Sequence, residues 1–463
     1  MTDSPEKTLQ ITVARQVVLP KAQLHPVVRR FLREKLFIPN SDYIVKQRLG
    51  KPLYNVPKFF DLIEEDSTCL RLPRGFLGQL TGLLAKERIA FTVTYDYPGH
   101  ETCVYTNNIA LRPEQAHLVD EVFAAGSGVL VAPPGSGKTI MGLELVARHQ
   151  KPALILTHRK QLLDQWVETI QAQFGIPKKQ IGRYSSAYKK PGEHITVGLL
   201  QSFARMKDIS AFADMFGVII VDECHHIPAT TFRAVISQLN APHAYGLTAT
   251  PRRKHNDERL IYLYISDTVA VMDTSTGSGD TKESAGFDIT IRQTSLRLPF
   301  DWKRDQFELL AKTICYDTAR NEQIIQDISA RVKQGRRILV LSERKEHLKI
   351  LELHVRSSCR TLTFSGEDSA SSRAAKLEQI DQGAYEVLLA TGQIFGEGIH
   401  IPNVEVLVLA FPFAFVGKLT QYVGRLAHGT NPCELIDYRD AHIETLEKQY
   451  KQRRRYYNKI QPL

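Results

Sequence analysis

The chain has 463 residues, a formal net charge of +10 at pH 7 and a pI near 9.2. At this length we expect about three domains, and the basic charge fits a polyanionic partner. The six cysteines form no C-x-x-C pair, and no apolar run approaches the ~20 residues of a transmembrane helix. These features argue against a disulfide framework, a cysteine zinc site and a membrane span. Because the polar start also carries no signal peptide, we expect a cytoplasmic protein.

Residues 1–110 are predicted to form a basic module of mixed α/β fold. Phe31, Tyr43 and Tyr54 are interleaved with a run of basic residues between Ala14 and Lys58. The basic residues of this run are Arg15, Lys21, Arg29, Arg30, Arg33, Lys35, Lys46, Arg48, Lys51 and Lys58. The run is either a nucleic-acid surface that pairs with phosphates and stacks on bases, or a solvated helix face beside core aromatic residues.

In residues 111–272 the pattern changes to short apolar runs that alternate with helical stretches. The runs lie at 129–132, 153–156, 195–199, 218–221 and 244–247. Continuous apolar runs followed by polar or glycine-containing turns are typical of parallel strands that are buried on both faces. The segment is therefore expected to form an α/β lobe.

A Gly/Ser-rich stretch interrupts the alternation, and we expect a linker or exposed loop at 273–290. Apolar runs resume at 338–341, 387–390, 404–410 and 435–436, which predicts a second α/β lobe over 291–463. The chain ends in a predicted basic helix around 448–459. Four apolar residues share one face of this helix region, namely Ile443, Leu446, Tyr450 and Tyr457. This pattern favours a packed helix with a charged outer side.

The strongest chemical signal is APPGSGKT at 132–139, directly after a predicted strand. Small residues let consecutive backbone N–H groups surround a phosphate, and the following helix adds the positive end of its dipole. Ala132 stands where the strict pattern has Gly. The residues expected to bind ATP are Gly135, Ser136, Gly137, Lys138 and Thr139. Lys138 would reach the β- and γ-phosphates, and the Thr139 hydroxyl would bind Mg²⁺.

A second signal is GVIIVDECHH at 217–226, an apolar strand that ends in two carboxylates. Ligands of open α/β sheets bind at the carboxyl ends of the strands. Asp222 would bind Mg²⁺, and Glu223 would orient and deprotonate the attacking water. For the adjacent His225 and His226, a coupling hydrogen bond or plain packing is favoured over a metal pair.

These motifs, followed by LTATP at 247–251 and QYVGR at 421–425, resemble the motor motifs of superfamily 2 helicases. Within that superfamily the chain is similar to the XPB-like DNA translocases and to the helicase component of bacterial TOTE conflict systems. The likeness includes LRPEQ at 111–115, ILTHRKQLLDQW at 155–166, LLQSF at 199–203 and IDYRD at 436–440. It also includes LRLPRGFLGQLTGLL in the N-terminal module. The resemblance implies two tandem RecA-like lobes that hydrolyse ATP between them.

The resemblance also implies roles for individual residues. Gln115 would read adenine, and Thr248, Ala249 and Thr250, with His225, would couple hydrolysis to strand movement. The positions that would contact the nucleic-acid backbone are His158, Arg159, Gln201, Ser202, Ser342, Arg344, Phe364 to Gly366, and Thr391. The positions that would close on ATP from the second lobe are Glu397, Gly398, Gln421 and Arg425.

Two residues depart from the family pattern. His428 stands where the pattern Q-x-x-G-R-x-x-R has its second arginine, and His400 stands where an Asp is usual. A mostly neutral histidine is a poor substitute for an arginine that stabilises phosphoryl charge. Arg425 remains to supply that charge, and we therefore expect an active but slow ATPase.

Three functional hypotheses follow. The chain is a DNA-stimulated ATPase that translocates on or unwinds DNA, an ATP-switched DNA-binding or regulatory subunit of a defence or repair complex, or the motor subunit of a multi-component defence complex. No nuclease motif is evident, so cleavage would need an accessory nuclease. The first and third hypotheses are compatible, and DNA is preferred over RNA through the resemblance alone.

Overall fold

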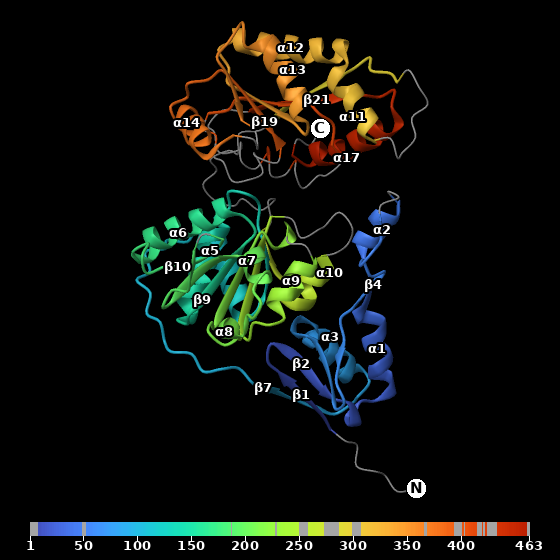
Figure 1. Ribbon diagram of the computed structural model, residues 1–463, viewed down its shortest axis with the longest axis vertical. Coiled ribbons are helices and arrows are strands. Elements are labelled where there is room, and N and C mark those ends of the chain that lie inside the picture. The colour runs from blue at the N-terminus through green and yellow to red at the C-terminus, as the bar shows by residue number, and fades with distance from the viewer. Residues whose placement is uncertain are drawn as a thin grey trace. The chain divides into compact units, whose positions relative to one another are not determined.

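The computed structural model describes residues 8–48, 52–186, 188–226, 229–249, 258–272, 287–298, 307–364, 368–392, 401, 403–413, 419, 422–423 and 433–460. The chain divides into two compact units, Met1–Asp273 and Thr274–Leu463. Figure 1 shows the first unit in blue to green and the second in yellow to red. Each unit contains a largely or wholly parallel sheet, which confirms the expected α/β fold class.

The N-terminal module is built on a mixed five-stranded sheet of order β5-β6-β2-β1-β7. Its strands are β1 (Leu9–Val13), β2 (Gln16–Pro20), β5 (Glu64–Glu65), β6 (Cys69–Pro73) and β7 (Phe91–Tyr95). A separate two-stranded ribbon pairs β3 (Phe37–Pro39) with β4 (Phe59–Asp61). The helices are η1 (Lys21–Gln23), α1 (Pro26–Leu36), α2 (Ser41–Arg48), η2 (Arg74–Phe76) and α3 (Leu77–Lys86).

The first lobe has an eight-stranded sheet of order β11-β10-β12-β9-β13-β14-β8-β15, parallel except for β10–β11. The strands are β8 (Gly128–Val131), β9 (Ala153–Thr157), β10 (Gly182–Tyr184), β11 (Lys189–Lys190), β12 (Ile195–Leu199), β13 (Val218–Asp222), β14 (His243–Thr248) and β15 (Thr268–Val271). The helices are α4 (Pro113–Ala124), α5 (Lys138–His149), α6 (Lys160–Phe174), α7 (Leu200–Ala204), α8 (Ser210–Ala213), η3 (Cys224–His226), α9 (Ala229–Ile236) and α10 (Glu258–Tyr264). All five predicted apolar runs of this lobe are strands, as expected for strands that bury both faces.

The two faces of this sheet pack against different partners. Leu130, Ile155 and Ile220 face a core that includes residues of α4, α5 and α6. Their strand neighbours, such as Leu154 and Ile219, face the opposite core, which includes residues of α7 to α10 and of the N-terminal module. The N-terminal module and the first lobe therefore share one hydrophobic core within one compact unit.

Specific contacts fix the N-terminal module on this face. The buried Arg74 guanidinium donates to the Ala241 carbonyl and to Ser127 Oγ at 3.2 Å. A Cβ atom on Gly75 would lie 2.2 Å from the Tyr262 carbonyl oxygen, so only glycine fits against α10. Arg233 of α9 donates to Tyr264 Oη at 3.0 Å and to the Asp61 carbonyl at 3.3 Å. The RG pair of the LRLPRGF segment is thus a docking point.

The second unit has a six-stranded parallel sheet of order β16-β21-β20-β17-β19-β18. Its strands are β16 (Phe287–Gln293), β17 (Ile338–Ser342), β18 (Thr361–Phe364), β19 (Val387–Thr391), β20 (Val406–Leu409) and β21 (Cys433–Arg439). Its described helices are α11 (Phe307–Tyr316), α12 (Thr318–Lys333), α13 (Lys345–Val355), α14 (Ala370–Asp381) and α17 (Glu444–Ile460). Three of the four apolar runs expected here lie in strands, and the fourth, at 404–410, contains β20 and extends beyond it. The predicted face of the terminal helix is buried.

The expected linker at 273–290 is too long at its C-terminal end. β16 begins at Phe287 and pairs in parallel with β21. Its sequence alternates apolar and polar residues, as is typical of an edge strand, and therefore contains no continuous apolar run. Residues 273–286 lie outside the described residues.

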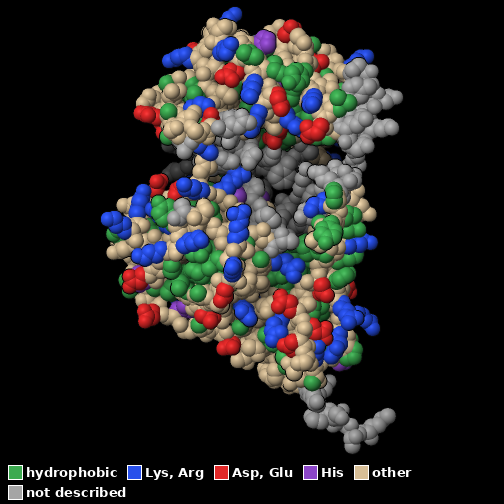
Figure 2. Space-filling model, viewed as in Figure 1, with side chains coloured by type: hydrophobic (Ala, Val, Ile, Leu, Met, Phe, Trp, Pro, Cys, Tyr) green, Lys and Arg blue, Asp and Glu red, His purple; other side chains and the backbone are tan. Residues whose placement is uncertain are grey.

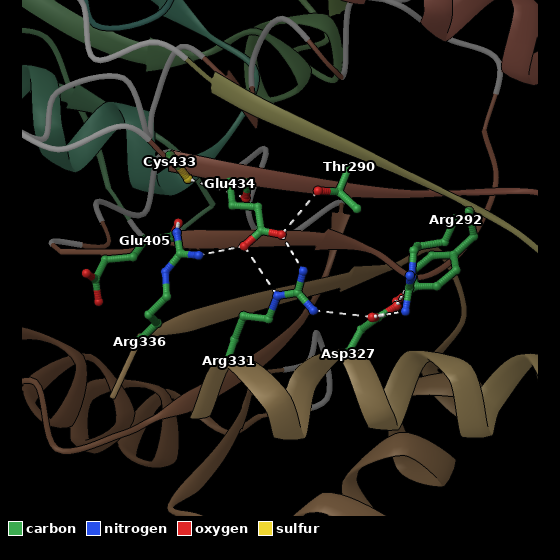
Figure 3. Close-up of polar contacts among 9 residues, drawn as sticks. Thr290, Arg292, Asp327, Arg331, Arg336, Glu405, Cys433 and Glu434 are labelled. Atoms are coloured by element: carbon green, nitrogen blue, oxygen red, sulfur yellow. Dashed lines mark hydrogen bonds and ion pairs between the residues drawn. The ribbon is translucent and has the colours of Figure 1, made fainter. Parts of the chain in front are cut away.

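A polar network within the second unit connects this edge strand to α12 and connects α12 to β21 (Figure 3). Arg292 of β16 pairs with Asp327 of α12 at 2.8 Å, and Arg331 of α12 pairs with Glu434 of β21 at 2.5 Å. Arg336 reaches the other oxygen of Glu434, also at 2.5 Å. Burial raises the pKa of Glu434, but Arg331 and Arg336 lower it more, so its net pKa lies below the ordinary value. Glu434 is therefore a paired carboxylate at neutral pH.

Candidate nucleotide site and strand-contacting edge

The phosphate loop connects β8 to α5 at the carboxyl edge of the eight-stranded sheet. Gly135 and Gly137 adopt φ values of +78° and +84°, a region that favours glycine. Lys138 and Thr139 form the first turn of α5, as the sequence predicts. The backbone N–H groups at the start of α5 and the helix dipole make this end a site for an anion.

Gln115 lies directly against this loop. Its Nε2 donates to the Ser136 carbonyl at 2.7 Å, and its Oε1 accepts from the Arg112 N–H at 2.9 Å. Arg112, which sequence reasoning overlooked, donates a second bond to the Ser136 carbonyl at 3.0 Å. A Cβ atom on Gly137 would meet Gln115 Nε2 at 2.5 Å. In this structure Gln115 therefore supports the loop, and its reading of adenine stays a prediction.

The two predicted acidic residues lie beside the loop lysine. Lys138 Nζ is 3.7 Å from Glu223 Oε1 and donates to the carbonyls of Ala132 and Pro133 at 3.1 and 3.3 Å. Asp222 ends β13 and accepts bonds from Trp166 Nε1 at 2.8 Å and from the Glu223 N–H at 2.9 Å. Burial and the neighbouring Glu223 carboxylate raise the pKa of Asp222.

The side chains at this site fit a bound Mg²⁺ ion and a nucleoside triphosphate. The carboxylates of Asp222 and Glu223 are adjacent, and Glu223 lies 3.7 Å from Lys138. Burial first, and then the charge of Glu223, raise the pKa of Asp222, and a divalent cation would offset both effects. The buried Ser136 hydroxyl has no hydrogen-bond partner among the residues that the structure describes, so it can bond an oxygen of a bound ligand. Asp222 and Thr139 would hold the metal, and Lys138 with the loop would hold the phosphates.

A chain of close polar contacts, which ends in a hydrogen bond between His225 and Thr248, leads from this site to the end of β14. His225 Nδ1 lies 3.2 Å from Glu223 Oε2 and 2.7 Å from Thr248 Oγ1. Glu223 adopts a φ of +44°, which is unusual for a residue with a side chain and which turns the chain into η3. The expected hydrogen bond of His225 is thus present. Ala249 follows in a buried position, and Thr250 lies outside the described residues.

The predicted backbone-contacting residues of the first lobe lie at the same sheet edge. His158 and Arg159 follow β9, and Gln201 and Ser202 lie in α7 directly after β12, the neighbour of β9. Gln201 Nε2 donates to the His158 carbonyl at 3.1 Å, which brings the two segments together. Burial and the charge of Arg159 lower the pKa of His158 to about 4, so it is neutral at pH 7.

In the second unit, three of the predicted backbone-contacting residues, Ser342, Phe364 and Thr391, also lie at the carboxyl ends of parallel strands. They end β17, β18 and β19, three adjacent parallel strands. Ser342 is buried, however, and its hydroxyl accepts from the Arg344 N–H and contacts His347 Nδ1, both at 3.2 Å. Its side chain thus shapes the turn. Arg344 forms a bidentate pair with Glu308 at 3.0 Å, which a phosphate would have to replace.

Several predicted residues lie outside the described part of the chain. They are Gly366, Glu397, Gly398, His400, Gln421, Arg425 and His428. Trp166, by contrast, was overlooked as a site residue although it contacts Asp222. Its place on the apolar face of α6 indicated burial, and a buried indole N–H that requires an acceptor was the available signal.

Two family profiles cover most of the region that contains these motifs. Residues 108–253 match the type III restriction enzyme res subunit, and residues 319–429 match the helicase conserved C-terminal domain. No helix among the described residues combines the length and the apolar character needed to cross a membrane.

Among similar proteins, a candidate DNA 3'-5' helicase, Rad25, of Halobacterium salinarum is 28% identical over 65% of this chain and 49% of its own length. A candidate ATP-dependent RNA helicase of Acanthamoeba polyphaga mimivirus is 24% identical over 88% of this chain and 78% of its own length. The chain thus spans about half of the first relative. Proteins named DNA 3'-5' helicase XPB match over 37% of the chain.

The fold is also similar to that of the Pyrococcus furiosus Hef helicase domain. The TM-score is 0.51 at 14% identity, and the match covers 76% of this chain and 98% of that one. At this identity the likeness concerns the fold alone.

Proposed function

We propose that this chain, a superfamily 2 helicase by its two matched domains, is a nucleic-acid-dependent ATPase that acts as a DNA helicase or translocase. The observation that carries the proposal is the chain of contacts from Lys138 through Glu223 and His225 to Thr248. Its three contacts measure 3.7, 3.2 and 2.7 Å, and this proximity supports the roles in hydrolysis and coupling that we propose for these residues.

Each residue around the phosphate loop has a separate role in the proposed hydrolysis of ATP. The glycine-rich loop and Lys138 bind the triphosphate, and Lys138 exchanges its bonds to two loop carbonyls for bonds to phosphate oxygens. Thr139 and Asp222 would hold Mg²⁺, which when bound would offset the charge of the phosphate oxygens. Glu223 orients the attacking water and accepts its proton. Gln115 holds the loop in shape and is the expected adenine contact.

The second unit is proposed to complete the ATP site. Glu397, Gly398, Gln421 and Arg425 carry this role through the family resemblance, and Arg425 would supply the positive charge that opposes charge developing on the phosphate. Closure over ATP and reopening after hydrolysis would then move the backbone-contacting residues of the two lobes along a strand. Because these contacts go to phosphates, movement is independent of base sequence.

DNA is the proposed track. The Rad25 and XPB relatives are named DNA 3'-5' helicases, whereas the mimivirus relative is named an RNA helicase. A motor that reads only the backbone separates DNA from RNA through the 2′-OH. We therefore propose DNA and take 3'-5' as the first polarity to test. From the sequence resemblance we also propose that the chain acts in a system similar to the bacterial TOTE conflict systems, with an accessory nuclease as partner.

A second candidate function rests on His428 and His400. With these substitutions the chain would be an ATP-switched DNA-binding or regulatory subunit that hydrolyses ATP slowly. Both candidates bind ATP and DNA, but only the motor performs ATP-driven work on a strand.

Displacement of a labelled strand from a short duplex with a 3' single-stranded tail tests this difference. We expect ATP-dependent displacement by the wild type and none by Lys138→Ala, which retains the DNA contacts. Arg425→Ala should also abolish displacement. Displacement that is equal with and without ATP, or unchanged in Arg425→Ala, would favour the switch over the motor.

A further inference from the structure

The β3–β4 ribbon of the N-terminal module exposes a pair of stacked aromatic rings. Phe37 and Phe59 lie on its outer face with ring centroids 4.7 Å apart and an interplanar angle of 19°. Their strand neighbours Ile38 and Phe60 point inward and are buried in the core shared with the first lobe. Phe37 is nevertheless 50% exposed. Burial of Ile38 and Phe60 on the inner face stabilises the ribbon against the core. The Phe37–Phe59 pair on the outer face is not needed for this packing and leaves apolar surface in contact with solvent.

The aromatic pair continues a basic helix face. α1 buries Val28, Leu32 and Leu36, which leaves Arg29 and Arg33 on its outer side. The helix ends at Leu36, and the N–H of the following Phe37 donates to the Arg33 carbonyl. Arg29, Arg33 and Phe37 thus follow one another at intervals of four residues. One guanidinium nitrogen of Arg29 donates to the Lys21 carbonyl at 3.0 Å.

The charge around the pair is mainly positive. Lys58 Nζ lies 5.7 Å from the centre of the Phe59 ring, and Lys35 lies in the last turn of α1. Three carboxylates are also near: Glu34 beside Lys35 at 3.2 Å, Asp61 opposite Phe37 in the ribbon, and Glu65, which pairs with Lys21. Lys21, and to a smaller extent Arg29 and Arg33, lower the pKa of Glu65, so a strand along these arginines would pass this carboxylate. Figure 2 shows hydrophobic side chains at the surface near β4 with basic side chains beside them.

We propose that Phe37 and Phe59 form a base-stacking platform for an unpaired nucleotide of single-stranded DNA, with the strand's phosphates continuing along Arg33 and Arg29. Aromatic rings flanked by cations bind single strands, because every base presents a flat face and every nucleotide carries a charge. A duplex conceals its base faces inside the stack, so the platform selects unpaired DNA. This inference rests on the proposed function and names the part of the substrate that the N-terminal module would hold.

The test uses the full-length protein and a single-stranded oligonucleotide that contains 2-aminopurine, whose fluorescence falls when the base stacks. The double variant Phe37→Ala/Phe59→Ala should lose about 5- to 100-fold in single-strand affinity and most of the quenching. Affinity for blunt duplex DNA should change by less than about twofold, because duplex bases do not stack on the rings. Phe37→Leu, which retains apolar volume without a π-face, should also lose the quenching, and Phe37→Trp should retain it.

Tyr95→Ala is the matched control. Tyr95 is 63% exposed and stacks on Tyr97, and it lies at the end of β7, in the five-stranded sheet of the module and not in the β3–β4 ribbon. It should leave affinity and quenching unchanged. Unchanged quenching in both Phe37→Leu and the double variant would overturn the platform, as would an equal loss of duplex affinity. If the wild type shows DNA-stimulated ATP hydrolysis in these cases, the proposed function stands alone. If the wild type neither binds DNA nor responds to it, both proposals fail.

Discussion

At the scale of single residues, the candidate site depends on a few side chains with more than one partner. Glu223 contacts both Lys138 and His225, and the Nδ1 atom of His225 contacts both Glu223 and Thr248. The left-handed backbone of Glu223 places its carboxylate between these two groups, at a conformational free energy on the order of 1 kcal/mol. Strain at such a position is typical of functional sites, where the surrounding structure maintains it. We infer that Thr248 senses the state of Glu223 through His225.

Thr248→Val tests this link because it replaces the buried hydroxyl with a methyl group of similar volume. Lys138, Asp222 and Glu223 are unchanged, so ATP hydrolysis should persist. The ATP consumed per displaced DNA strand should rise by roughly fivefold or more, because hydrolysis is no longer coupled to movement. The measurement is phosphate release and strand displacement in the same reaction.

The control for this variant is Thr169→Val, which makes the same change at an exposed hydroxyl of α6 that bonds the Gln165 carbonyl. It should leave the ratio of ATP to displaced strand at the wild-type value. An unchanged ratio in Thr248→Val would show that the His225–Thr248 bond plays no part in coupling.

At the scale of elements, the N-terminal module docks on the helices that follow the two motif-bearing strands. α9 follows Asp222 and Glu223 in the chain, and α10 follows Thr248. η2 packs on α10 through Gly75, while Arg233 of α9 reaches the carbonyl of Asp61. The candidate nucleotide site and the N-terminal module are therefore joined through elements that contact each other.

Gly75→Ala should disrupt this docking, because the new Cβ would lie 2.2 Å from the Tyr262 carbonyl oxygen and 2.8 Å from that of Leu263. Overpacking against backbone costs about 1 to 3 kcal/mol, so thermal unfolding should shift downward. Proteolytic cleavage between the module and the first lobe should also become faster.

Gly78→Ala provides the contrast within the same segment. A Cβ at this position of α3 meets nothing within 4 Å, so the change should stabilise the helix by roughly 0.5 to 1 kcal/mol. Equal melting temperatures for the two variants, measured by differential scanning calorimetry, would contradict the docking account.

At the scale of the whole molecule, the parallel sheets were the most predictable feature. Strands such as β13 and β17 are buried on both faces, and their sequences are therefore almost continuous apolar runs. The edge strands β11 and β16 were overlooked, because one is only the exposed pair Lys189–Lys190 and the other alternates in polarity. Their pairing depends on partners that are distant in sequence.

The candidate site likewise combines residues that a local sequence pattern predicts with residues that only tertiary contacts identify. Lys138 and Asp222 could be placed because a phosphate loop and a strand end have local sequence patterns. The support from Arg112 and Trp166 depends on tertiary contacts to Ser136 and Asp222, for which no local pattern exists. Ser342 had the expected position, but its burial followed from packing against His347 in α13.

The measurement that tests the central claim most directly is phosphate release from ATP and Mg²⁺ without nucleic acid and with single-stranded DNA, duplex DNA or RNA. Glu223→Gln serves as the blank, because it retains the shape of the site and removes the proton acceptor. We predict that DNA stimulates release by the wild type and that Glu223→Gln lowers the rate by about 10² to 10⁴. Background release under all four conditions, with ATP still bound, would contradict the account and identify the chain as a switch.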